Sequence, residues 1–178
     1  MDRPSPVGTP YTAAAGQPIS KWSARIFDEL RGWADQRQGQ WAWWPEGYLV
    51  LTVDRINGQE IEPMVLHTWG EELTLELRHW DTHFPDWNSP EADDPSQIAV
   101  EAVSVAESWL AGRFALAVYF AGDKWCGSRT VEPDEDRIAM MADIAWIKDF
   151  GPERVELRWA DKLRLEHFIF SNGQLVSP

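Results

Sequence analysis

Cysteine is almost absent from this chain, since Cys126 is the only one in 178 residues. An internal disulfide is therefore excluded, and a chain of this length can bury enough apolar surface to fold without one. No apolar run approaches the roughly 20 residues that cross a bilayer as a helix. These two features predict a cytoplasmic protein.

Basic residues are also scarce, with 16 Lys and Arg against 29 Asp and Glu, which gives a formal net charge of −13. Such a charge repels phosphate backbones and anionic lipids, so we expect no direct binding to nucleic acid or membranes. One interpretation is that the acidity keeps a chain with 12 tryptophans soluble. The other is an acidic face complementary to a basic partner, and both can hold.

The common signature motifs of catalysis and cofactor binding are missing from the sequence. There is no GxxxxGK[ST], GxGxxG, GxSxG, HExxH or CxxC. We therefore expect a protein without a cofactor that is not an enzyme, although catalytic groups can also assemble from residues far apart in the chain.

Residues 1–18 are rich in Pro, Gly, Ser and Thr, a composition that cannot bury enough surface to fold alone. They lack the basic start and continuous apolar core of a signal peptide, so we predict an N-terminal arm. Residues 19–178 are predicted to form one domain. Trp41, Trp43 and Trp44 cannot all face inward, and an exposed one would mark a binding surface or a docking site for the arm.

Apolar periodicity predicts helices over residues 21–36 and 95–111. Ser20 is placed to cap the first helix, and Asp94 the second, with Gly112 beyond its end. Residues 133–150 fit both a helical and a strand period, and we favour a helix. Four tryptophans on apolar stripes are predicted to be core residues: Trp22, Trp33, Trp109 and Trp146.

Alternation of apolar and polar residues predicts strands over 48–56, 59–67, 71–80, 114–120, 125–131, 154–159 and 163–170. Asn57-Gly58 supplies the positive φ values of a two-residue hairpin turn. Pro63 cannot donate a ladder hydrogen bond, so its strand should lie at an edge or carry a bulge. Short connections between neighbouring strands predict an α+β fold, a mainly antiparallel sheet of hairpins with two or three amphipathic helices packed on it.

The segment His79-Trp-Asp81-Thr-His83 combines residue types that bind zinc or manganese. On one straight strand, however, His79 and His83 would lie roughly 13 Å apart and could not share an ion unless the chain bends. The alternatives are a partly buried histidine held by hydrogen bonds, or a role in partner contact.

No Lys or Arg lies between Arg78 and Arg113, whereas seven acids do. A second acidic cluster surrounds Pro133. Aromatic and apolar residues mixed with charge are typical of interface centres. The predicted partner-binding residues are Asp86, Trp87, Glu91, Asp93, Asp94, Asp134, Glu135 and Asp136; a solvated loop or acids at helix N-termini are the alternative.

The segment EELTLELRHWDTHF, followed by an acidic loop and the helix, resembles small acidic immunity proteins of bacterial polymorphic toxin systems over about residues 71–131. The resemblance implies a cytoplasmic, non-enzymatic protein that binds a cognate basic toxin and occludes its active site. Two alternatives stay open. One is a small metal-assisted enzyme that uses His79, Asp81 or His83 with His67 or His167, and the other is a module that self-associates through exposed tryptophans.

Overall fold

The structure is a computed structural model that describes residues 19–43, 47–85, 94–134, 136–171 and 174–177. The chain divides into two compact units, unit 1 (residues 1–106) and unit 2 (residues 107–178). Each unit is described by itself, although we predicted one domain over residues 19–178. The predicted N-terminal arm lies outside the described residues.

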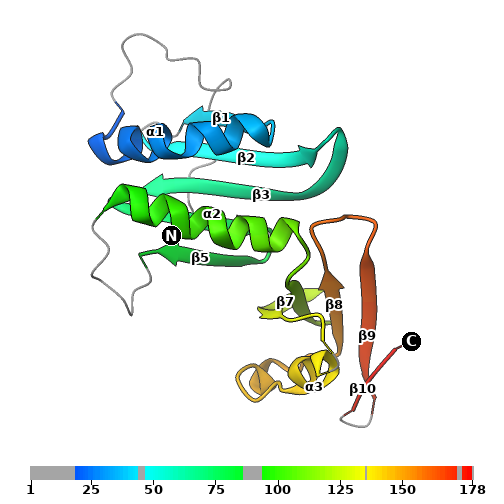
Figure 1. Cartoon of the computed structure of the whole chain (residues 1–178). Helices are drawn as coiled ribbons and strands as arrows, with labels where there is room; N and C mark the ends of the chain where they lie inside the picture. The colour runs from blue at the N-terminus through cyan, green and yellow to red at the C-terminus, as the bar shows by residue number, and fades with distance from the viewer. Residues whose placement is uncertain (1–18, 44–46, 86–93, 135, 172–173, 178) are drawn as a thin grey trace. The chain divides into compact units, whose positions relative to one another are not determined.

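Unit 1 contains a five-stranded antiparallel sheet in the order β1-β2-β3-β4-β5, so that strands consecutive in the sequence are neighbours (Figure 1). Its strands are β1 (Gln40–Trp43), β2 (Leu49–Ile56), β3 (Gln59–Trp69), β4 (Glu72–Leu77) and β5 (Trp80–Phe84). Strand β1 was not predicted. The β3 strand is central rather than at an edge, and the predicted irregularity occurs where the pairing of β2 and β3 shifts between Val53 and Arg55.

The turn between β2 and β3 is the predicted one, since Asn57 and Gly58 have φ values of 52° and 80°. The predicted strand 71–80, in contrast, is wrong beyond Leu77. The chain reverses through Arg78 and His79, and Leu77 pairs with Trp80. Arg78 adopts a φ of 54°, which few residues other than glycine and asparagine favour, and so its sequence gave no turn signal.

Helix α1 (Lys21–Gln36) begins as predicted at Ser20, whose side chain accepts a hydrogen bond from the Ser23 N–H. One turn of the helix is fixed to the sheet, because the Ser23 and Thr68 hydroxyls lie 2.7 Å apart and Thr68 accepts from the Leu49 N–H. Ile26 and Leu30 are buried on the same side of the helix. The face of the sheet that carries Thr68 is therefore covered by α1.

Helix α2 (Pro95–Leu110) contains the boundary between the units. Asp94 caps it as predicted, since its Oδ1 accepts from the Ser96 N–H at 3.2 Å, and Gly112 follows its end with a φ of 65°. The helix buries Ile98, Ala102, Ala106 and Trp109. Among the described residues, no helix is long and apolar enough to cross a membrane.

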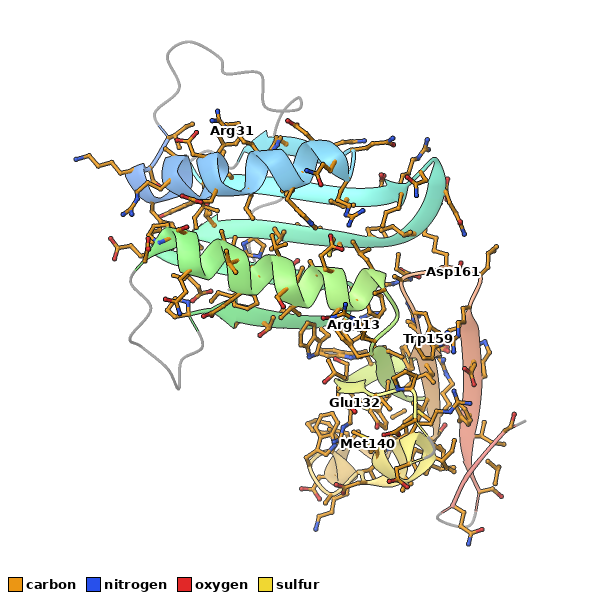
Figure 2. The ribbon with its side chains drawn as sticks, viewed as in Figure 1. Arg31, Arg113, Glu132, Met140, Trp159 and Asp161 are labelled. Carbon is orange, nitrogen blue, oxygen red and sulfur yellow. The ribbon has the colours of Figure 1, made fainter. Side chains whose placement is uncertain are left out.

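Unit 2 contains a second antiparallel sheet in the order β10-β9-β8-β6-β7. Its strands are β6 (Ala115–Ala121), β7 (Lys124–Val131), β8 (Arg154–Arg158), β9 (Leu165–Ser171) and β10 (Gln174–Val176), of which β10 was not predicted. One face carries the core, including Tyr119, Leu157 and Phe168. Trp159, which directly follows β8, belongs to the same core and is labelled in Figure 2. The α+β class is confirmed, with two sheets in place of one.

The segment 133–150 contains a short helix, α3 (Arg137–Ala142), and a 3₁₀ turn, η1 (Lys148–Phe150), and it adds Met141 and Ile147 to the core of the second sheet. The buried Tyr119 hydroxyl donates to the Met141 carbonyl at 3.1 Å, and the Arg129 guanidinium donates to the Met140 carbonyl. Trp109 is a core residue as predicted, and Trp22 and Trp33 are half-buried. The prediction for Trp146 is wrong, because its side chain is 47% exposed.

Candidate functional site

The pairing of the unit 1 strands fixes which side chains share a face of the sheet. Leu51, Leu66 and Leu75 pair in one row and are buried on the face that α1 covers. Because neighbouring residues of a strand alternate between faces, the next row lies on the opposite face. That row runs Val50, His67, Thr74, His83 across β2, β3, β4 and β5.

The opposite face combines carboxylates with an exposed tryptophan. Trp69 pairs with Glu72 at one end, and Glu76 pairs with Asp81 two rows away. We call Trp69, Glu72, Glu76, Asp81 and His83 the carboxylate face. Trp69 is 46% exposed and contacts Tyr48 with ring centroids 4.8 Å apart, and half of the Asp81 side chain is exposed. The face therefore offers an aromatic ring and three carboxylates to solvent.

His83 lies between two of the carboxylates. Its Nδ1 is 2.5 Å from Glu72 Oε1, and its Nε2 is 3.2 Å from Asp81 Oδ2. The Thr74 hydroxyl donates to the same Glu72 oxygen at 3.0 Å and lies 3.1 Å from His83 Nδ1. A neutral imidazole has one N–H, so only the ring protonated at both nitrogens can donate to both carboxylates.

His67 holds the third carboxylate, since its Nε2 lies 2.9 Å from Glu76 Oε1 while its side chain is almost fully buried. Glu76 and Asp81 are nevertheless directly opposite one another on neighbouring strands. Like charges at such positions destabilise a sheet. The two histidines compensate this repulsion in part, each by binding one member of the pair.

The carboxylate face has the groups that bind a cation. Thr74 is the hydroxyl nearest to His83, but it is fully buried, so it cannot reach a substrate as a nucleophile. Exposed carboxylates beside an indole ring match a guanidinium or ammonium group, which gains from both the negative charge and the ring face.

The predicted metal ligands are only partly brought together. Asp81 and His83 are neighbours on β5, whereas His79 lies in the turn before it, where its N–H donates to the Leu77 carbonyl. Over the described ranges, no group of three or more His, Cys, Asp or Glu side chains could hold a metal ion. His167, the other histidine considered for this site, is exposed on β9 in unit 2.

The predicted partner-binding residues are described only in part. Asp94 is exposed and serves as the cap of α2, with the Arg25 guanidinium 3.6 Å from its carboxylate. Asp134 and Asp136 are exposed before α3, where the Asp136 N–H donates to Asp134 Oδ1. The remaining residues lie outside the described ranges: Asp86, Trp87, Glu91, Asp93 and Glu135.

Sequence reasoning missed Trp69, Glu72 and Glu76 as site residues. Glu76 alternates with Leu75 and Leu77, so its position on the outer face could be read from the pattern. The residues that face Glu76 on the neighbouring strands could not be predicted, because the turn at Arg78 was not recognised. That turn places Asp81 opposite Glu76.

These features define a small α+β protein with a carboxylate-rich sheet face. No family model matches the chain, and searches of curated proteins and of solved structures returned no match. Statements of function therefore depend on the residues and contacts themselves.

Proposed function

We propose that this protein is a non-catalytic binding protein that recognises a basic protein partner through the carboxylate face. Within that class, the resemblance of residues 71–131 to immunity proteins favours an intracellular inhibitor of a cognate bacterial toxin. The toxin would be neutralised by occlusion of its active site.

The observation that carries the proposal is the pair Glu76 and Asp81. Two carboxylates directly opposite on neighbouring strands weaken the sheet, so their presence has a cost in stability. Binding of a cation from a partner would relieve that repulsion. His67 and His83 compensate the repulsion only in part, and features that lower stability are expected at functional sites.

The distribution of charge along the chain supports the same proposal. Unit 1 contains 17 Asp and Glu against seven Lys and Arg, whereas unit 2 contains 12 against nine. Most of the net negative charge therefore belongs to the unit that carries the carboxylate face. A field of this sign accelerates the association of a basic partner, and the effect falls as salt is added.

Trp69 provides an apolar anchor, which charged side chains alone do not provide. Interface hot spots are enriched in tryptophan, and a charge-paired surface without an apolar anchor gives fast association but short residence. Its neighbour Glu72 binds His83 and Thr74 through Oε1. The other oxygen of Glu72 has no hydrogen bond to the described residues and can accept one from a partner's guanidinium.

The test is co-expression of the chain with the product of the gene immediately upstream, scored by growth rescue and co-purification. With a complex in hand, Asp81→Lys and Trp69→Ala should each weaken binding by about tenfold or more. Asp28→Lys is the matched control, because Asp28 is an exposed carboxylate on α1 in the same unit and the change in net charge is identical.

Two results would contradict the proposal. If Asp28→Lys weakens binding as much as Asp81→Lys, only net charge acts and the face is wrongly assigned. If the upstream product is harmless and forms no complex, the toxin-inhibitor function itself fails.

A further inference from the structure

The second sheet carries an apolar row on the face opposite its core. The pairing runs Val176 with Ile169, Ile169 with Arg154, Arg154 with Phe120, and Phe120 with Trp125. We call these five residues the arginine row. They come from all five strands, and at about 4.8 Å per strand the row spans roughly 19 Å.

Exposed apolar residues concentrate in this part of the protein. Eight of the ten exposed large hydrophobic side chains among the described residues belong to unit 2. Single exposed apolar residues are ordinary, but three of these eight lie in the arginine row: Trp125, Ile169 and Val176. Phe120 is buried, so the exposed apolar groups of the row flank Arg154, with Ile169 and Val176 on one side and Trp125 on the other.

Arg154 lies at the middle of the row, with its guanidinium carbon 3.9 Å from the centre of the Phe120 ring. It donates through Nη1 to Glu156 and through Nε to the Gly122 carbonyl. The two N–H groups of Nη2 have no acceptor among the described residues. Phe120 holds the guanidinium in place, so these donors are positioned in advance for an incoming acceptor.

Arg154 shares its carboxylate partner, Glu156, with a second arginine. Glu156, next along β8, is bound by both Arg154 and Arg158, so one carboxylate faces two guanidiniums. Burial alone would raise the pKa of Glu156, but the hydrogen bonds and charges of the two arginines lower it below its ordinary value. Glu156 is therefore ionised at neutral pH, and two guanidiniums share its single negative charge.

The guanidinium of Arg154 decides between the possible occupants. A second copy of the chain packed about a two-fold axis through the row would place Arg154, its central residue, against itself, and the two positive charges would repel. An occupant with a carboxylate at the centre and apolar groups on both sides is complementary instead.

We propose that the arginine row is a docking surface for another protein, which presents an Asp or Glu carboxylate between two apolar side chains of an extended segment. The carboxylate accepts from Nη2 of Arg154. The apolar side chains pack on Trp125 and on Ile169. In an extended segment, side chains two residues apart are on the same face and about 6.6 Å apart, so the matching pattern is apolar-x-acid-x-apolar.

The test uses the full chain and capped, fluorescein-labelled peptides of the sequence Thr-Leu-Thr-Glu-Thr-Phe-Thr, followed by fluorescence anisotropy. The peptide with Glu should bind about tenfold more tightly than the same peptide with Gln, because a charged acceptor makes the stronger hydrogen bond. Arg154→Gln should abolish this preference. Ile169→Gln should weaken both peptides alike, and thermal melts establish that each variant is folded.

Leu163→Gln is the matched control, since Leu163 is 88% exposed in the same unit but lies outside the row, between β8 and β9. It should leave both affinities unchanged. Equal binding of the two peptides, or a preference for Glu that survives Arg154→Gln, would overturn the proposal. So would a dimer in sedimentation velocity that Ile169→Gln dissociates, because the row would then bind a second copy.

Discussion

A Cβ atom added to Gly127 would lie 2.7 Å from Cζ3 of Trp146, so the indole ring covers the backbone of β7 at this glycine. The same ring meets Tyr119 edge to face, with centroids 5.6 Å apart. Trp146 is therefore half-exposed and still holds the segment after α3 against the sheet. The absence of a side chain at position 127 is what allows this close approach.

Gly127→Ala should lower the free energy of unfolding by about 1–3 kcal/mol, because the new methyl group displaces both Trp146 and Ile147. Urea denaturation measures the change. In a Trp146→Ala background the same substitution should have a smaller effect, since the main obstacle is gone.

Gly32→Ala is the control for the Gly127 substitution. Gly32 is exposed within α1, and a Cβ there would meet no atom within 4 Å. Alanine is the better helix former, so this variant should gain about 0.5–1 kcal/mol. If both substitutions stabilise the protein, the ring of Trp146 does not cover Gly127.

Tyr119 should make stability depend on pH in the alkaline range. Burial raises the pKa of Tyr119 from 10.0 to about 12, against the opposing charge of Arg129. A raised pKa in the folded state gives stability that is fully present below pH 10 and is lost as the pH rises through about 12. Tyr119→Phe should remove this loss between pH 10 and 12, as measured by urea unfolding at a series of pH values.

At neutral pH, Tyr119→Phe should still cost about 1 kcal/mol, because the Met141 carbonyl loses its hydrogen bond. If the stability of the Tyr119→Phe variant falls between pH 10 and 12 as steeply as that of the unmodified protein, another group titrates in this range.

Glu156 should make the stability depend on pH in the acid range, where the stability falls as the pH is lowered. Its pKa is lowered by the hydrogen bonds and charges of Arg158 and Arg154, which outweigh the effect of burial. Its contribution is therefore present above about pH 4.5 and is lost as the pH falls through the lower pKa of the folded protein. Glu156→Gln should cost about 1–3 kcal/mol at pH 7, and this cost should shrink as the pH falls through the lowered pKa, by urea unfolding at a series of pH values below 4.5.

Glu166→Gln is the control for Glu156, because Glu166 also binds an arginine, Arg137, but about a third of each side chain is exposed. Its cost should stay below about 1 kcal/mol. Equal costs for the two substitutions would mean that the pairing with two arginines adds nothing.

Local patterns were sufficient to predict both long helices and most hairpins. Ser20 and Asp94 satisfy backbone N–H groups through their own side chains, and Asn57-Gly58 tolerates positive φ through its own chemistry. In each case the physical cause lies within a few residues of the feature. Such features can be read from one sequence without knowledge of the rest of the fold.

Features set by contacts across the fold could not be predicted in the same way. Trp146 fitted an apolar stripe, but its environment depends on Gly127 and Tyr119, which are distant in sequence. The carboxylate face likewise depends on strand pairing, because Glu76 and Asp81 become neighbours only when the chain reverses between them. A period-two pattern also does not predict how the strands divide between two sheets.

The turn at Arg78 gives the sharpest test of this distinction. Its φ of 54° is imposed by the pairing of β4 with β5 and not by its own preference, so glycine should be favoured there. Arg78→Gly should be more stable than Arg78→Ala by about 1 kcal/mol in urea denaturation, and Arg78→Val should be the least stable. All three variants lose the ion pair with Glu62 equally, so the differences among them report the backbone. At Gly32, where φ is not positive, alanine should instead be more stable than glycine. If alanine is also the better residue at position 78, the chain does not reverse there with a positive φ, and Asp81 loses its place opposite Glu76.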